Sequence, residues 1–238
     1  MLLALETSAE RGGVALFEGA ELVGEADVAE TERHAASLLV RLDELFARVG
    51  RRLDDVGEIA LAIGPGSFTG LRIGLATALG LAFGTERKLV PVPTLAALAL
   101  QADAHGLVVP LLDARRNEVY AGLYDGAGSE LAPDLCAPLA EVLERLPARE
   151  PLALLGSGAE LHRAALAAAL GPRARLLPAE AGVLRARSVG HLGLALSARG
   201  GSRAPEAVEL RYLRRAEAEA KRLALHRNAE PIPWVQPR

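Results

Sequence analysis

Aromatic residues, cysteine and charge of one sign are all scarce in this sequence of 238 residues. Phe, Trp and Tyr make up only 3% of it, which argues against single-stranded nucleic-acid binding by base stacking, because that mode needs aromatic platforms. Cys136 is the one cysteine, so an intrachain disulfide and a multi-cysteine metal site are excluded. The formal net charge of −3 provides no strong field to attract nucleic acid or a membrane surface.

A long uncharged apolar run is missing as well. The longest stretch without a charged residue, 89–102, contains two prolines and is too short to span a bilayer. The first apolar run ends at Glu6 with no basic segment before it, unlike a signal peptide. Half of the residues are nevertheless hydrophobic, so a sizeable core is possible. We therefore expect a soluble, cytoplasmic protein with no membrane partner.

Apolar periodicity divides the first half of the chain into strands and helices. Three short strands joined by tight turns are predicted at the start, as an antiparallel meander. Helices and strands then alternate, which is typical of a mixed sheet covered by helices. The predicted strands are 2–6, 14–17, 21–28, 59–63 and 89–92, and the predicted helices are 33–49, 67–83 and 94–104.

The second half repeats part of this plan. Residues 108–113 read as a strand that ends at an acid, as 2–6 does, and 152–163 repeat the order strand, Gly-Ser-Gly, helix. A repeat unit this long predicts two related lobes rather than a solenoid. We expect an α/β protein whose parts are a first lobe at 1–105, a second lobe at 106–210 and a basic helix with a proline-containing tail at 211–238.

The stretch GPGSFTG at 64–70 joins a predicted strand to a predicted helix, as phosphate-binding loops do. A Walker A loop requires a lysine after its last glycine, and Leu71 stands there instead. Gly64, Gly66 and Gly70 also miss the spacing of dinucleotide-binding loops by one residue. Backbone amides at the helix start could still hold a phosphate. The candidates for cofactor contacts are Ser8, Gly66 and Ser67.

Close helix packing is a second interpretation of the same glycines. Small residues recur every four positions along the helix predicted for 67–83, which places them on one smooth face. Such a face lets another backbone approach closely. The opposite side is apolar too, so we expect one side to lie on the sheet and the other to meet a neighbouring helix or another protein chain. The small residues are Gly66, Gly70, Gly74, Ala78 and Ala82, and the larger ones opposite are Leu71, Leu75 and Leu79.

Few polar groups point to catalysis. Glu6 and Asp113 end the first strands of the two halves, where carboxylates could hold a metal or act as a base; a capping or solvated acid is the alternative. The five histidines show no metal-binding helical spacing, and no serine or cysteine lies in a recognised nucleophile motif. Residues 211–227 are basic and could either contact RNA phosphates or form an amphipathic surface helix.

Six stretches spread over nearly the whole chain carry a family resemblance. They are LLALETS at the start, ERHAASLL at 32–39, IGPGSFTGLRIG at 63–74, VPTLAALA at 92–99, LLDARRNEVYAGLY at 111–124 and AVELRYLRR at 207–215. In these stretches the sequence resembles the bacterial TsaB (YeaZ) family. Members of that family are partner proteins in the synthesis of tRNA threonylcarbamoyladenosine.

The resemblance implies an actin-like (ASKHA, ribonuclease H-like) fold with two duplicated lobes. It implies binding to the catalytic relative TsaD, which modifies an adenosine beside the tRNA anticodon, to the ATPase TsaE, and to a second copy when the protein is free. The tRNA would be reached indirectly through the complex, and ATP or ADP could sit at its junction. TsaD holds its metal with two helical histidines; Thr94 and Leu98 stand at those places and cannot replace imidazole. No catalytic residue, metal ligand or required cofactor is therefore expected.

The first two helices form the docking surface of that family. We therefore expect a non-catalytic scaffold or activator subunit that binds TsaD, and we expect a bulky residue at Gly70 or Gly74 to weaken the complex while the monomer stays folded. An ATP-dependent or glycoprotease-like enzyme using Glu6 or Asp113 remains an alternative, as does a tRNA-binding module using 211–227. The expected contacts are Leu38, Leu39, Leu42, Gly66, Gly70, Arg72, Gly74, Leu75 and Ala78.

Overall fold

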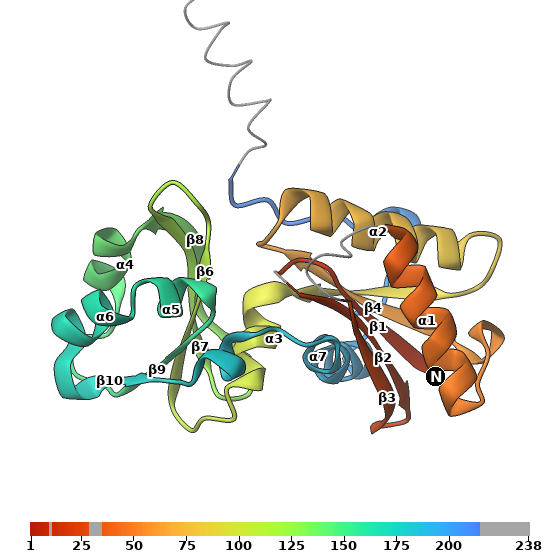
Figure 1. Cartoon of the computed structure of the whole chain (residues 1–238), viewed down its shortest axis with the longest axis horizontal. Coiled ribbons are helices and arrows are strands. Elements are labelled where there is room, and N and C mark those ends of the chain that lie inside the picture. Colours follow the sequence, from red (N-terminus) through yellow and green to blue (C-terminus); the bar gives the residue numbers. More distant parts are fainter. Residues whose placement is uncertain (10, 29–34, 215–238) are drawn as a thin grey trace, which may run out of the picture.

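The computed structural model describes residues 1–9, 11–28 and 35–214, and it places them in two lobes that lie side by side (Figure 1). The first lobe is built on a five-stranded sheet in the order β3-β2-β1-β4-β5. Its strands are β1 (Leu2–Glu6), β2 (Gly12–Glu18), β3 (Glu21–Val28), β4 (Glu58–Gly64) and β5 (Lys88–Pro93). The predicted meander and both later strands are confirmed.

The second lobe contains a second five-stranded sheet, in the order β10-β9-β6-β7-β8. Its strands are β6 (Leu107–Asp113), β7 (Glu118–Asp125), β8 (Glu130–Pro138), β9 (Leu152–Leu155) and β10 (Ala174–Leu176). In each sheet the first strand pairs antiparallel with the second and parallel with the fourth. The duplication predicted from the sequence is therefore present in the strand order itself.

The central strands are apolar because both of their faces are covered. All five residues of β1 are buried, and β6 is buried along its middle, as expected for strands packed between two layers. On one face of the first sheet, Leu3 and Leu5 pack with the helices α1 and α2. On the other face, Leu2 and Ala4 belong to a core that continues into the second lobe.

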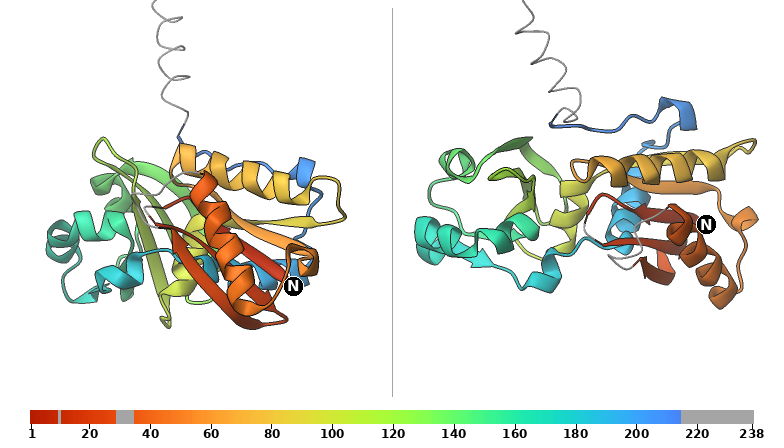
Figure 2. Two further views of the ribbon diagram at one scale, coloured as in Figure 1. Left: turned by 45° about the vertical axis from the view of Figure 1, so that its right-hand side comes forward. Right: turned by 45° about the horizontal axis from the view of Figure 1, so that its top comes forward.

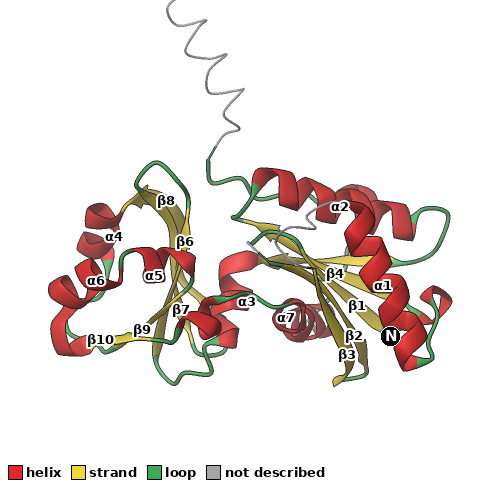
Figure 3. Ribbon diagram, viewed as in Figure 1, coloured by secondary structure: helices red, strands yellow, loops and turns green. Residues whose placement is uncertain are grey.

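Within the described residues, seven α-helices cover the two sheets (Figure 3). They are α1 (Ala35–Val49), α2 (Phe68–Ala82), α3 (Thr94–Gln101), α4 (Leu139–Arg145), α5 (Ser157–Leu161), α6 (Arg163–Leu170) and α7 (Ala186–Ala198). Short 3₁₀ helices are η2 (Leu53–Asp55), η3 (Gly171–Arg173), η4 (Ala179–Gly182) and η5 (Pro205–Ala207). The predicted helix at 33–49 begins at Ala35 within the described residues, and the one at 94–104 ends at Gln101.

The two lobes are not two contiguous stretches of sequence. Helix α7 lies within the range expected for the second lobe, yet it packs on β1, β2, β4 and β5 of the first sheet. Gly190 and Gly193 allow this approach, because a Cβ at either position would collide with Phe17 or Ala60. In exchange, α3 from the first half packs against β6 and β7. The chain therefore crosses between the lobes more than once (Figure 2).

The final described residues also depart from expectation. Residues 211–214 contain no helix, although the sequence predicted a basic helix there; the rest of that helix and the tail lie outside the described residues. The polypeptide instead runs back across the top of α2 toward the second lobe (Figure 2, right). None of the helices in the described ranges combines the length and the apolar character needed to cross a membrane.

Candidate functional site

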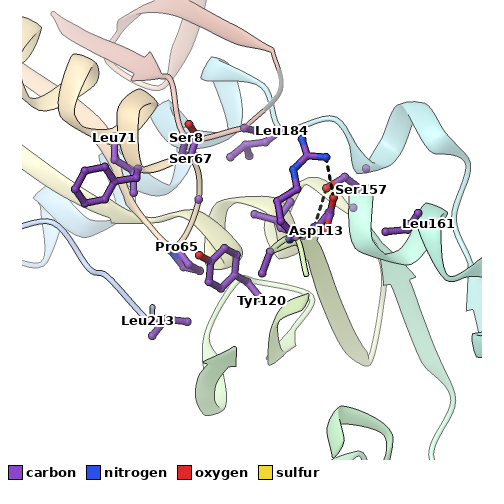
Figure 4. A pocket seen from close by; sticks show the side chains of 18 of the residues that line it. Ser8, Pro65, Ser67, Leu71, Asp113, Tyr120, Ser157, Leu161, Leu184 and Leu213 are labelled. Carbon is purple, nitrogen blue, oxygen red and sulfur yellow. Dashed lines mark hydrogen bonds and ion pairs between the residues drawn. The ribbon is translucent and has the colours of Figure 1, made fainter. Parts of the chain in front are cut away.

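A cleft of about 1250 Å³ separates the two lobes. Its first-lobe wall comes from the end of β1, the glycine loop and the start of α2, and its second-lobe wall comes from the β6–β7 turn and α5. Figure 4 shows Ser8 and Ser67 on one side, with Asp113 and Ser157 on the other. Residues 179–184 and 211–214 complete the lining. The cleft is thus formed by segments that are far apart in the sequence.

The glycine loop packs tightly on the end of β1. A Cβ at Gly66 would collide with the backbone of Ser8, and one at Gly70 would collide with the carbonyl oxygen of Thr7. The amide of Ser67 donates to the carbonyl of Ser8 at 2.7 Å, and the Ser67 hydroxyl caps α2 by accepting from the amide of Gly70 at 3.2 Å. The glycines therefore allow two backbone segments of this chain to approach closely, as the second of the two sequence interpretations predicted.

This packing corrects the expected role of the small-residue face. Gly74 and Ala78 are buried, and a Cβ at Gly74 would collide with the Thr7 hydroxyl. The face is occupied by the end of β1, so it is not available to a partner chain in this conformation. Since Gly70 packs on the Thr7 backbone in the same way, we expect a bulky residue there to destabilise the monomer itself, and the expectation that the monomer stays folded remains a prediction.

Glu6 is a completely buried acid behind the cleft. Its Oε1 accepts hydrogen bonds from the Ser8 amide at 2.6 Å, the Ser8 hydroxyl at 2.8 Å and the Ala9 amide at 2.8 Å. Its Oε2 has no hydrogen-bond partner among the residues that the structure describes. Burial raises the pKa of Glu6 to about 7, although the three hydrogen bonds oppose that shift. Glu6 caps the turn after β1, as one of the two sequence interpretations proposed, and it does not line the cleft.

Thr94 and Leu98, the residues predicted to stand in place of metal-binding histidines, both have structural roles. Thr94 is buried; its hydroxyl accepts from the Gly64 amide at 3.1 Å and donates to the Ser8 hydroxyl at 3.3 Å. Leu98 lies in the core between the lobes. Thr94 therefore ties the glycine loop to the end of β1. Among the residues that the structure describes, no cluster of three or more His, Cys, Asp or Glu side chains could hold a metal ion.

The second-lobe wall carries the other predicted acid. Asp113 lines the cleft, accepts from the Arg115 amide at 2.7 Å and pairs with the Arg115 guanidinium at 3.2 Å. Its own amide donates to the Ser157 hydroxyl at 3.1 Å. Arg115, Arg116 and Asn117 all have positive φ, a conformation that non-glycine residues seldom adopt. Nothing in the sequence pattern indicated this turn geometry.

Two arginines of the predicted basic segment pair with acids of the second lobe. Arg211 lies 3.1 Å from Oδ2 of Asp134, and Arg214 forms an ion pair with Glu118. Burial raises the pKa of Asp134 to about 6, while a hydrogen bond from Tyr124 and the charge of Arg211 oppose the rise. These arginines therefore neutralise internal carboxylates. The rest of the segment at 211–227 lies outside the described residues.

The expected partner contacts divide by burial. Leu38 and Leu42 were expected at the partner surface, but both lie in the core of the first lobe. Leu39 and Arg72 are exposed, and Gly66, Gly70 and Leu75 are half-buried. Val40 on α1 and Phe83 directly after α2 are exposed as well, and neither was among the predicted contacts. The available signal was that Val40 stands next to Leu39 and that Phe83 precedes a glycine.

Comparisons with known proteins now bear on this arrangement. Residues 28–175 match the family model described as TsaD, tRNA N6-adenosine threonylcarbamoyltransferase. The tRNA threonylcarbamoyladenosine biosynthesis protein TsaB from Bacillus subtilis (strain 168) is 31% identical over 92% of this chain and 96% of its own length.

Solved structures agree with these sequence matches. YeaZ from Pseudomonas aeruginosa aligns with a TM-score of 0.75 and 30% identity, covering 89% of this chain and 99% of that one. An activator of the 2-hydroxyisocaproyl-CoA dehydratase from Clostridium difficile aligns with a TM-score of 0.50 and 8% identity over 84% of this chain and 97% of its own. The second match supports the fold alone, and with the duplicated sheets it confirms the expected actin-like (ASKHA) architecture.

Length-wide identity, the matching fold and the glycine loop docked on the end of β1 lead to one assignment. The chain belongs to the TsaB (YeaZ) family of tRNA threonylcarbamoyladenosine biosynthesis proteins.

Proposed function

We propose that this protein is a non-catalytic scaffold subunit that binds the threonylcarbamoyltransferase TsaD. The observation that carries the proposal is an apolar, solvent-facing surface on α1 and α2. Among the described residues, four of the seven exposed large hydrophobic side chains lie on or directly after these two helices. They are Leu39 (45% exposed), Val40 (54%), Leu79 (37%) and Phe83 (89%).

The exposed side of α2 is a continuous stripe. Thr69, Arg72, Ala76, Leu79 and Phe83 are all exposed and follow one another at spacings of three and four residues, so they share one helix face. This stripe lies opposite the small residues that pack on β1. Apolar side chains gathered on adjoining helices are the usual core of a protein interface, and a single arginine among them can form a specific polar contact.

A second copy of this chain would use the same surface when TsaD is absent. Self-association and TsaD binding would then be mutually exclusive, which is why a homodimer is expected only for the free protein. TsaE and the tRNA would join through the complex with TsaD, and the expectation of ATP or ADP at that junction stays a prediction. Localisation in the cytoplasm, where the tRNA is modified, is part of the same proposal.

The proposal is tested by mixing the purified protein with its cognate TsaD and measuring the molar mass by size-exclusion chromatography with light scattering. The wild-type chain should form a 1:1 complex. V40D and L79D should each weaken TsaD binding about tenfold or more, because a carboxylate buried in the interface would reduce the binding free energy at least as much as the loss of one hot-spot side chain. L131D is the matched control, since Leu131 is an equally exposed apolar residue (52%) on the second lobe. Equal affinities for all three variants would contradict this placement.

The alternative functions have less support. An enzyme that used Glu6 as a base would need substrate to reach a carboxylate that is fully buried and bonded to the loop after β1. A tRNA-binding module that used 211–227 would lose two of its cations to Asp134 and Glu118. Activity of the purified chain that disappears in D113N, or salt-dependent tRNA binding by the isolated protein, would revive one or the other.

A further inference from the structure

We infer that residues 208–214, here called the strap, are a releasable closure element that holds the two lobes together across the cleft. The strap begins on the first lobe, passes over the glycine loop and ends on the second lobe (Figure 2). It lines the cleft with Arg211, Tyr212, Leu213 and Arg214. This inference concerns the conformation of the chain itself and does not depend on the proposed binding of TsaD.

The first-lobe end of the strap is anchored by the backbone and by apolar burial. Val208 is buried in the core beneath α1 and α2. The Arg211 amide donates to the carbonyl of Ile63 at 2.7 Å, and Gly64 lacks the Cβ that would collide with the Arg211 carbonyl. Backbone hydrogen bonding and apolar burial are insensitive to salt. The strap therefore belongs firmly to the first lobe.

Aromatic packing adds a second first-lobe contact. The ring of Tyr212 lies 5.1 Å from that of Phe68 on α2, centroid to centroid. Its hydroxyl accepts from Nε of Arg72 at 3.3 Å, and the Arg72 guanidinium stacks 3.9 Å above the Phe68 ring. These three side chains fix the direction in which the strap leaves α2.

The second-lobe end is held differently, by the charged side chains of two arginines. Arg211 lies 3.1 Å from Asp134 and 3.5 Å from Glu130 on β8. Arg214 pairs with Glu118 on β7 and donates to the carbonyl of Ala114 at 2.6 Å. The Arg211–Glu130 and Arg214–Glu118 pairs join partly exposed side chains, and such ion pairs are individually weak. We therefore expect the strap to dissociate at its second-lobe end rather than at its first-lobe end.

One acid makes the closed position favourable. The side chain of Asp134 is completely buried, with Oδ1 accepting from the Tyr124 hydroxyl at 2.7 Å and Oδ2 facing Arg211. If the strap left, this carboxylate would lose the opposite charge of Arg211 while Glu130 of the same strand stayed nearby. A buried charge without a partner is strongly unfavourable. The closed position is therefore favoured, because Arg211 neutralises the buried Asp134 carboxylate, which would have no such partner in the open state.

The opposite side of the cleft provides the pivot. Residues 177–185 cross from the second lobe back to the first, and the Gln101 side chain pins this crossing. Its Nε2 donates to the carbonyls of Ala181 and Val183, and its Oε1 accepts from Arg185 and Ser188. The crossing and the strap line the same cleft. Release of the strap would therefore let the lobes separate about the crossing, as a hinge.

The test is the distance between the lobes, measured by electron paramagnetic resonance. One spin label is placed at Ala20→Cys on the first lobe and one at Ala168→Cys on the second, both exposed, in a C136A background. Labelled protein is diluted with unlabelled protein, so that distances between copies do not contribute. The unsubstituted strap should give one narrow distance distribution. R211A combined with R214A should at least double its width or add a longer distance.

R51A is the matched control, because Arg51 pairs with Glu18 within the first lobe; it should leave the distribution unchanged. A folded R211A/R214A protein, as judged by urea unfolding, with an unchanged distribution would overturn the inference. If that double variant does not fold, E118Q decides, since it removes the partner of Arg214 and leaves Asp134 paired. A broadened distribution in E118Q supports the strap as the closure element, and an unchanged one overturns it.

Discussion

Titration of Glu6 should make the protein less stable as the pH rises toward neutrality. Its carboxyl has a pKa of about 7 in the folded protein, against 4.5 as the reference for an exposed side chain. Between these values the folded state holds a proton that the unfolded state has lost. The free energy of unfolding therefore falls as the pH rises, and the loss is complete once the pH is above about 7.

The size of the effect follows from the pKa difference. A difference of about 2.5 corresponds to about 3 kcal/mol, because each pKa unit represents about 1.36 kcal/mol. Glu6 is fully buried, so solvent screening does not reduce this value. Asp134, whose pKa is raised to about 6, adds a smaller change of the same sign over a lower pH range. A D134N variant separates the two contributions.

Urea unfolding at fixed temperature, from pH 4.5 to 8.5, measures the effect directly. E6Q is the informative variant, since its carbonyl oxygen can accept the hydrogen bonds from Ser8 and Ala9 while its side chain does not titrate. Asp134 still titrates in E6Q, so the stability of this variant should be nearly flat above about pH 6, where that of the wild-type protein still declines. Above pH 7 it should equal or exceed the wild type. Parallel curves for the two proteins, or a wild-type stability that increases between pH 5 and 7, would refute the reasoning.

Further predictions concern packing and the interlobe crossing. G70A should lower the free energy of unfolding by about 1–3 kcal/mol because its Cβ collides with Thr7. G80A on the same helix should raise it by about 0.5–1 kcal/mol, since a Cβ there meets open space; urea unfolding that ranks the two the other way would contradict the packing. Q101L should cost about 2–4 kcal/mol, because three hydrogen bonds to the crossing at 177–185 and one to Ser188 on α7 are lost. A Q101L protein as stable as the wild type would show that the crossing is held by other contacts.

Local sequence patterns were sufficient for most of the strands. β1 and β3 have the predicted bounds, because β1 is an apolar run that ends at an acid and β3 begins directly after the turn at Gly19. The repeat of strand, Gly-Ser-Gly and helix was also visible, since both lobes use the same connection after their fourth strand. These features depend on residues close to one another in the chain.

Burial on α2 could not be assigned in the same way. The helix is apolar on several sides, and its sequence does not say which side meets its own chain. The small face of Gly70 and Gly74 turned out to lie on Thr7, so the surface proposed for TsaD is instead the stripe ending at Phe83. Periodicity predicts that a face is buried, and only the placement of β1 decides what covers it.

The sequence by itself determined most of the strands, the duplicated α/β plan and the family, because each depends on local periodicity or on short motifs. Tertiary structure alone decided that α7 covers the first sheet, that Glu6 is sealed from the cleft and that Arg211 pairs with Asp134. Each of these joins residues that are distant in the chain or sets how far a group is removed from water. Ion pairing and the pKa of a buried acid both follow from that spatial arrangement, which a residue's neighbours in sequence do not specify.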